Sequence, residues 1–320
     1  MAPVVAAGGS SAFDKLGYWS PNTASVDWCE NNYVVSFYIA EFWNTVSNIA
    51  CFIAAALGIY FFPGNERRFT LLFTTCGFVG LGSVLFHGTL RHKMQLLDEL
   101  PMLYSATIIL FILVEAKHGP QGKWFPILLT AWIGKTSADF FIVNDIGSLV
   151  CEPHSILSIL SQFQATTTFI FSTTRDQLQF YTFQSTYTIL QFGMIYFLRV
   201  LHVQQRAIRG VNPDISTLIR RAFGLAFFAV TIWLIDLRLC EFVNGVGARS
   251  VLKWNPQLHA WWHVFSACAL YHATMMVIYY HYDVQGRRPY VGWWRGCIPV
   301  IRLFGQLPQH PKSKLLQCCY

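Results

Sequence analysis

Two histidines lie one helical turn apart in the stretch HAWWH, as His259 and His263. Residues four positions apart project from the same face of a helix, and two imidazoles so placed can share a metal ion, typically zinc. The intervening Ala260, Trp261 and Trp262 exclude a zincin-type protease, because its general-base glutamate is missing. The pair alone also suits two incidental polar side chains, but the cost of burying them in a membrane-spanning helix favours a function.

A third histidine and two further polar residues could complete that site. His87 follows Ser83 by four positions in GSVLFHG, and Asp98 lies shortly after, in LLDELPM. His87 as a third ligand would leave the fourth tetrahedral position of zinc open for water, as in catalytic sites. Asp98 could then hold that water and transfer its proton. Each residue also has a plainer interpretation: a histidine at a helix end, a serine in helix packing and a carboxylate favoured by a helix N-terminus.

Oxygen-bearing side chains gather near the N-terminus. The stretch SVDWCENNY carries Asp27, Glu30 and Asn32, and Glu41 follows shortly after it. Hard oxygen ligands at this density suit calcium, which takes about six to eight of them. The spacing alone is more typical of a solvated acidic loop, and the glycine and twelve-residue loop of an EF-hand are missing.

Composition places these residues in a membrane protein. Of the 320 residues, 54% are hydrophobic and 12% are charged, half of the roughly 25% charged residues of soluble domains. That composition excludes a soluble globular protein, and it excludes a disordered one, because disorder requires low hydrophobicity. The net charge of +7 is concentrated in residues 199–221 and 287–314. Beside apolar spans, such basic stretches indicate cytoplasmic loops, so we expect no nucleic-acid partner.

Seven stretches meet the roughly 20 mostly apolar residues that a helix needs to cross a bilayer. They are Phe37–Phe62, Phe69–Leu90, Leu96–Val114, Trp124–Val143, Thr182–Leu201, Ala222–Ile235 (short, and extended by flanking residues) and Leu258–Tyr280. The sequence therefore predicts an all-α integral membrane protein with a seven-transmembrane helix bundle over residues 37–283. Residues 134–179 are rich in Ser, Thr, Gln and Asp, and we expect a lumenal loop, a re-entrant piece or an atypical insert there.

The positions of arginine and lysine predict the orientation, because cytoplasmic loops carry the excess of these residues. Basic residues at 67–68, 117–123 and 199–221 and in the C-terminal tail are separated by two spans each. We therefore expect residues 1–36 to be a lumenal segment and residues 284–320 a basic cytosolic tail. Residues 1–36 contain no apolar core flanked by basic residues, so no cleaved signal peptide is expected.

The nine cysteines form no disulfide scaffold and include no CxxC pair. In the expected topology Cys29 and Cys240 both lie on the lumenal side, where disulfides persist. They could pair, which would tie the acidic N-terminal segment to the bundle, or remain two free thiols. Cys318 and Cys319 do not form a CaaX box, and the sequence does not decide whether they are lipidated.

Several longer motifs combine these residues. DWCENNYVVSFYIAEFWNTVSN, GLGSVLFHGTL followed by QLLDELPMLY, and HAWWH together resemble the alkaline ceramidase family, and its phytoceramidases most closely. The resemblance implies a seven-helix intramembrane amidase of endoplasmic reticulum or Golgi membranes. Such enzymes hydrolyse the amide of ceramides to a free fatty acid and a sphingoid base, a step of sphingolipid metabolism.

The resemblance also implies roles for individual residues. The family's catalytic zinc ligands fall on His87, His259 and His263, its oxyanion-binding serine on Ser83, and the aspartate that serves the water on Asp98. Its calcium site, regulatory or structural, falls on Asp27, Trp28 (through its backbone), Glu30, Asn32 and Glu41. Its lumenal disulfide falls on Cys29 and Cys240. Residues 134–179 depart from the family, whose members carry clean fourth and fifth spans with a short connection.

Two other classes of protein compete with an amidase. A seven-helix receptor of the adiponectin-receptor type shares the zinc arrangement, but its N-terminus would lie on the opposite side. A transporter would use the histidines and Asp98 as a proton relay and would need no metal. The sequence does not predict the preferred ceramide class, the acyl-chain length, a reverse synthase activity or the oligomeric state.

Overall fold

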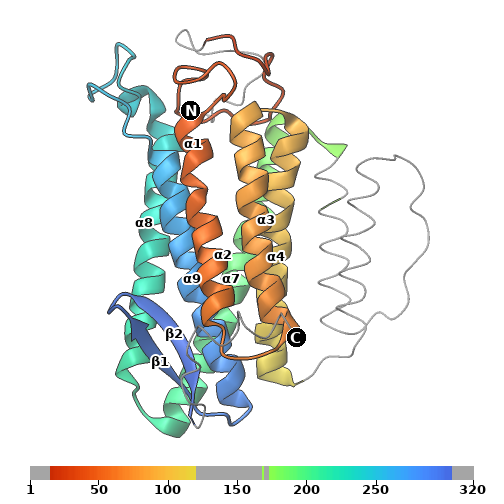
Figure 1. Cartoon of the computed structure of the whole chain (residues 1–320), viewed down its shortest axis with the longest axis vertical. Coiled ribbons are helices and arrows are strands. Elements are labelled where there is room, and N and C mark those ends of the chain that lie inside the picture. The colour runs from red at the N-terminus through yellow and green to blue at the C-terminus, as the bar shows by residue number, and fades with distance from the viewer. Residues whose placement is uncertain (1–14, 120–167, 169–172, 305–320) are drawn as a thin grey trace, which may run out of the picture.

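The computed structural model describes residues 15–119, 168 and 173–304 of the chain. These residues form mostly helices, with one two-stranded sheet (Figure 1). The helices are α1 Phe42–Ser47, α2 Ile49–Phe61, α3 Arg67–Thr89, α4 His92–His118, α7 Asp176–Arg209, α8 Pro213–Val243 and α9 Leu258–Val284. The strands are β1 Pro289–Trp294 and β2 Ile298–Leu303.

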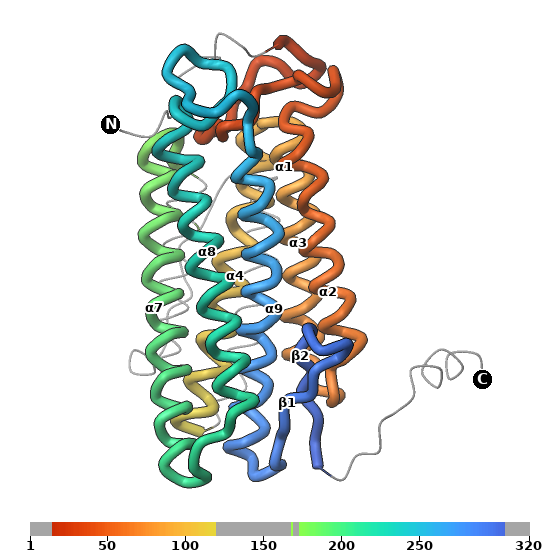
Figure 2. The backbone as a smooth tube through the Cα atoms, turned by 90° about the vertical axis from the view of Figure 1, so that its left-hand side faces the viewer, coloured from red at the N-terminus to blue at the C-terminus, as the bar shows by residue number. Residues whose placement is uncertain are grey.

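The helices run side by side in one elongated bundle (Figures 1 and 2). Helix α9 is its hub: it packs most extensively against α8 and also contacts α1, α2, α4 and α7. Helices α3 and α4 form the other closely packed pair. Buried residues follow one another without interruption from Thr274 to Tyr282 of α9 and from Leu103 to Val114 of α4. Helices buried on all sides in this way form the interior of a bundle.

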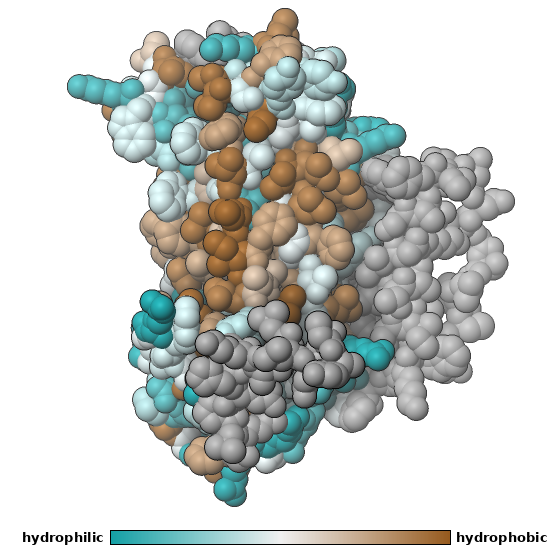
Figure 3. Space-filling model, in the orientation of Figure 1, coloured by the Kyte–Doolittle hydropathy of each residue, from teal (hydrophilic) through white to brown (hydrophobic). Residues whose placement is uncertain are grey.

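Within the described residues, four helical stretches are long and apolar enough to cross a membrane: Phe42–Phe61, α3, α4 and α8. Figure 3 shows their exposed apolar side chains as a band between two polar ends of the molecule. So large an exposed apolar surface is typical of contact with lipid, as expected for a multi-pass membrane protein. Helices α7 and α9 contain the expected spans Thr182–Leu201 and Leu258–Tyr280. The total of seven spans and their orientation remain predictions.

The expected boundaries differ from the observed ones in several places. The first helix begins at Phe42 rather than Phe37, and it is divided from α2 at Asn48. The short expected span Ala222–Ile235 is the middle of the much longer α8. The expected span Trp124–Val143 and most of the atypical stretch 134–179 lie outside the described residues. The last residues of that stretch, Asp176–Gln179, form the first turn of α7.

The prediction of an all-α chain is wrong in the region that follows α9. Strands β1 and β2 pair antiparallel from Pro289↔Leu303 to Trp294↔Ile298 and pack against α8 and α9. Their turn contains Arg295 and Gly296, both with positive φ, as a type I′ hairpin turn requires. Valine, isoleucine, tyrosine and tryptophan in these strands favour extended backbone. The basic residues of this region led us to expect only a cytosolic tail.

The bundle has two different ends. We call the end covered by residues 15–41 and by the α8–α9 loop the capped end, and the end that carries the β1–β2 sheet the hairpin end (Figure 1). Helices α3, α4, α7, α8 and α9 each run from one end to the other. The last turn of α3 and the first turns of α4 and α9 therefore meet at the capped end, where the candidate site lies.

Candidate metal centre

Three histidines meet beneath the cap. His87 comes from the last turn of α3, and His259 and His263 come from the first two turns of α9. One ring nitrogen of each lies within 4.8 Å of the others, and all three side chains are buried, with at most 6% of their surface exposed. Among the residues that the structure describes, this is the only group of three or more His, Cys, Asp or Glu side chains with ligand atoms so close together.

The hydrogen bonds of the histidines leave nitrogen atoms for a metal ion. Nδ1 of His87 forms a hydrogen bond of 2.5 Å with Oε2 of Glu41, and Nδ1 of His263 lies 2.8 Å from the hydroxyl of Ser47. Nε2 of His87 and Nδ1 of His259 are buried and have no hydrogen-bond partner among the described residues. Buried nitrogens are normally hydrogen-bonded. A metal ion bound by neutral imidazoles, with their second nitrogens held by protein groups, accounts for this arrangement.

Ser83 and Asp98 lie next to the histidines. Ser83 is one turn before His87 on α3, and its side chain lies close enough to the carboxylate of Asp98 on α4 to interact with it. Gly82 permits this contact, because a Cβ on Gly82 would lie 2.0 Å from the carbonyl oxygen of Leu97. The two helix backbones therefore touch at the level at which these side chains meet. Both Ser83 and Asp98 are buried.

Glu41, one of the residues that the resemblance assigns to calcium, also contacts one of the three histidines. Its fully buried carboxylate accepts hydrogen bonds from His87, from the backbone N–H of Trp28 at 3.2 Å and from Nδ2 of Asn44 at 3.1 Å. A carboxylate that orients a metal-binding histidine is a common feature of zinc sites. The indole of Trp28 stacks on the ring of His259, with centroids 3.7 Å apart. Both residues therefore contact metal-site histidines, a role that their position in the sequence did not reveal.

The other proposed calcium ligands lie beside this arrangement. Both carboxylate oxygens of Asp27 accept hydrogen bonds from Nδ2 of Asn32 at 3.2 Å. The carboxylate of Glu30 accepts the backbone N–H groups of Trp43 and Asn44, each at 2.8 Å, and so caps α1. Burial, with Glu41 nearby, raises the pKa of Glu30 to about 7. Burial also raises the pKa of Glu41, to about 8.

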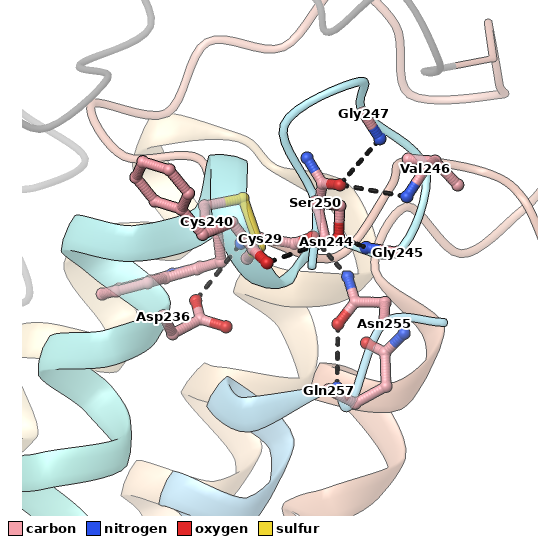
Figure 4. The surroundings of a disulfide bond; sticks show 12 residues. Cys29, Asp236, Cys240, Asn244, Gly245, Val246, Gly247, Ser250, Asn255 and Gln257 are labelled. Carbon is pink, nitrogen blue, oxygen red and sulfur yellow. Dashed lines mark hydrogen bonds between the residues drawn. A yellow bond between two sulfur atoms is a disulfide. The ribbon is translucent and has the colours of Figure 1, made fainter. Parts of the chain in front are cut away.

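A disulfide fastens the N-terminal segment to the bundle. Cys29 is bonded to Cys240 in the last turns of α8, and their Cα atoms are 5.4 Å apart (Figure 4). The backbone N–H of Cys29 donates to Asp236 at 3.2 Å, and Nδ2 of Asn255 donates to the carbonyl of Cys29 at 2.6 Å. Three parts of the chain, residues 15–41, α8 and the α8–α9 loop, are thereby linked above the histidines.

A second buried polar network lies on the other side of Asp98. Glu99 accepts hydrogen bonds from the amides of Gln95 at 3.1 Å and of Gln179 at 3.4 Å. Ser25 joins the two, because its N–H donates to Gln95 at 2.7 Å and its hydroxyl donates to Gln179 at 2.6 Å. Sequence reasoning missed this network. The one available signal was a second carboxylate directly after Asp98, with Gln95 one helical turn before it; Gln179 and Ser25 come from distant segments.

Comparisons of the sequence with known proteins point to a single family. Residues 20–302 match the model of a family described as Ceramidase. Alkaline ceramidase 3 of Mus musculus is 29% identical over 91% of this chain and 96% of its own length. An alkaline ceramidase of Saccharomyces cerevisiae is 32% identical over 80% of this chain and 76% of its own length. An alkaline ceramidase of Arabidopsis thaliana is 24% identical over 89% and 95%, respectively.

Proposed function

The chain belongs to the ceramidase family, and from that premise we propose that it is an alkaline ceramidase, an amidohydrolase that cleaves ceramide into a sphingoid base and a free fatty acid. The observation that carries this proposal is the convergence of His87, His259 and His263 within 4.8 Å, next to Ser83 and Asp98. Burying polar and ionisable side chains inside a membrane protein costs free energy, so a buried group of this kind indicates a functional site.

We propose zinc as the metal of this site. Three neutral imidazoles are a known ligand set of catalytic zinc, which keeps its fourth position open for water. Bound zinc would polarise the amide carbonyl and lower the pKa of the water. Glu41 and Ser47 would hold His87 and His263 in place through their Nδ1 atoms.

Asp98 and Ser83 can move the protons of the reaction. The Asp98 carboxylate takes a proton from the attacking water, as a general base does, and returns it to the nitrogen of the leaving sphingoid base. A serine hydroxyl has one proton to donate, and the charged carboxylate of Asp98 lies close enough to Ser83 to attract it. Once Asp98 is protonated, its neutral carboxyl group attracts the O–H of Ser83 less strongly than the carboxylate did. The Ser83 hydroxyl is then available to donate to the oxyanion that forms on the amide carbonyl.

The place of the site in the bundle suits a lipid substrate. The histidines lie in the last turn of α3 and the first two turns of α9, at the capped end of the bundle. The amide of a ceramide lies where its polar headgroup joins its two apolar chains. We therefore propose that ceramide reaches the site sideways from the bilayer, with its chains between the helices and its amide at the histidines.

The expected topology and location stay part of the proposal. The Cys29–Cys240 disulfide at the capped end favours a lumenal position for this end, because disulfides persist in oxidising compartments. The exposed arginines of the hairpin end favour a cytosolic position. The two ends would then lie on opposite sides of the membrane, as expected for seven spans in a protein of endoplasmic reticulum or Golgi membranes.

We also propose that the N-terminal segment binds calcium in a structural or regulatory role. Support comes from the contact of Asp27 with Asn32 and from the buried carboxylates of Glu30 and Glu41 nearby in the chain, because hard oxygen ligands gathered in this way suit calcium. Adding calcium to chelator-treated protein should raise its melting temperature, and less so in Asp27→Asn. Equal shifts in the two proteins would contradict a site at Asp27.

Fatty-acid release from a labelled ceramide by the purified full-length protein tests the main proposal. We expect His263→Ala to abolish release and a zinc chelator to suppress it in the wild type, with recovery on adding zinc. His272→Ala is the matched control, because His272 lies on α9 and its ring bonds only the carbonyl of Cys268 among the described residues. Undiminished release by metal-free wild-type protein or by His263→Ala would overturn the proposal.

A further inference from the structure

A hollow at the hairpin end has no role in the proposed hydrolysis. It has a volume of about 350 Å³ and lies where the segment after α9 meets the end of β2. Its lining combines two arginines with two apolar side chains: Gly286, Arg287, Arg288, Leu303 and Phe304. The zinc-site histidines lie at the opposite end of α9.

The two arginines of the hollow differ in their surroundings. The guanidinium of Arg287 lies over the ring of Tyr282, 4.5 Å from its centroid, and 3.9 Å from a carboxylate oxygen of Glu66. Arg288 is exposed and forms no ion pair with any residue that the structure describes. Its φ of 48° is a left-handed conformation that non-glycine residues seldom adopt. The hollow therefore has two positive charges: that of Arg287, held in place by Tyr282 and Glu66, and that of Arg288, which no acidic residue balances among those that the structure describes.

The surrounding surface adds to this positive charge. Exposed arginines of the hairpin end include Arg67, Arg206, Arg209, Arg220, Arg221, Arg287, Arg288, Arg295 and Arg302. Three nearby acidic groups already have basic partners: Glu115 pairs with Arg68, Asp283 with Arg209, and Glu66 with His281. The field around the hollow therefore attracts anions.

The hollow lies at the polar hairpin end of the molecule, beside the start of β1 and the end of β2. The apolar band gives way to polar side chains at the height of the β1–β2 sheet (compare Figures 1 and 3). Phe304 has 77% of its surface exposed, and Tyr290 and Trp294 of β1 are exposed as well. Exposed aromatic side chains at such a boundary are typical of the membrane–water interface.

We propose that this hollow binds the phosphate of an anionic phospholipid from the adjacent leaflet. Arg288, supported by Arg287, would contact the phosphate, since guanidinium groups bind phosphate through paired N–H donors. Leu303 and Phe304 would contact the glycerol backbone and the first acyl carbons. These apolar walls and the exposed aromatic side chains nearby favour a lipid over free phosphate. The site does not depend on the proposed ceramidase chemistry.

Native mass spectrometry of the full-length protein tests this site. The protein would be equilibrated with mixed micelles of phosphatidylcholine and phosphatidylserine, and the retained lipids counted. We expect the wild type to retain phosphatidylserine preferentially. Arg288→Gln should lower that retention about fivefold, the effect of one arginine near a charged membrane surface. Arg302→Gln is the matched control, because Arg302 is exposed on β2 but does not line the hollow.

Three outcomes would overturn the proposal. One is equal retention of the two lipids by the wild type, and another is an equal loss of phosphatidylserine in Arg288→Gln and Arg302→Gln. The third is complete displacement of phosphatidylserine by inorganic phosphate, which would assign the hollow to free phosphate. Because none of these readouts is hydrolysis, failure here leaves the ceramidase proposal intact, and the reverse also holds.

Discussion

The capped end and the hairpin end of the bundle use charged residues in opposite ways. At the capped end Glu41, Asp98 and Glu99 are buried, and their partners come from segments far apart in the chain. At the hairpin end the ion pair of Arg68 with Glu115 is partly exposed, and most arginines face outward. A buried charge depends on each of its partners, whereas an exposed pair is weakened by water and salt. Equivalent substitutions should therefore have large effects at one end and small effects at the other.

Replacing a buried carboxylate should give the largest difference between the ends. We expect Asp98→Asn to lower kcat for ceramide about 10²- to 10⁴-fold, because the general base is lost, and to leave the zinc content unchanged. Asp214→Asn is the control at the hairpin end, where this residue is exposed in the first turn of α8. Steady-state kinetics of both variants measure the effect. Equal kcat values for the two would contradict the role of Asp98.

A smaller effect is expected from the carboxylate that holds His87. Glu41→Gln should weaken zinc binding about 10- to 100-fold, as loss of such a partner does in other zinc sites. The measurement is zinc retention during dialysis against a graded chelator. Glu30→Gln is the control, because Glu30 is buried in the same segment but caps α1. Equal zinc retention by Glu41→Gln and the wild type would show that His87 does not need this partner.

The close contact of α3 and α4 should be sensitive to a single methyl group. Gly82→Ala would place a Cβ 2.0 Å from the Leu97 carbonyl, so the helices must separate, at a cost of about 1–3 kcal/mol. Separation would also pull Ser83 from Asp98 and reduce activity. Gly77→Ala on the same helix is the control, because its Cβ would meet that of Ala55 at an ordinary 3.7 Å. Thermal unfolding that shifts equally in both variants would argue against this contact.

The smallest effect is expected at the hairpin end. Arg68→Gln removes the ion pair with Glu115 and should change the free energy of unfolding by less than about 1 kcal/mol, because Arg68 is 39% exposed. That small change should shrink further at high salt. Thermal unfolding at two salt concentrations measures it. A decrease in the free energy of unfolding as large as that of Gly82→Ala would contradict the difference between the two ends.

Much of the fold could be predicted, because its signals are local. Apolar stretches of sufficient length indicated the cores of α2, α3, α4, α7, α8 and α9. The start of the first helix was missed because Phe37 and Tyr38 are apolar but lie in the N-terminal segment, before Glu41. The β1–β2 sheet was missed because residues 284–320 were interpreted from their basic residues alone, as a cytosolic tail. The turn at Arg295–Gly296 between two β-branched and aromatic runs was the signal that could have revealed it.

The candidate site was predictable in its histidines but not in its support. The spacing of His259 and His263 suggested a ligand pair, and the sequence also offered His87 as a third ligand and Asp98 as a general base. The resemblance supported these roles and added that of Ser83. Spacing could not show that Glu41 would contact His87 across 46 residues or that Ser25 would bridge Gln95 and Gln179. Such contacts depend on how the N-terminal segment folds over the bundle. No local pattern in the sequence encodes that path.

The metal content of the purified full-length protein tests the account most directly. Elemental analysis of active wild-type protein should find zinc bound to each chain, and His87→Ala should have lost it while retaining its helical circular dichroism. Fully active protein that hydrolyses ceramide with no bound metal, or His87→Ala with undiminished zinc, would contradict a metal centre built from His87, His259 and His263.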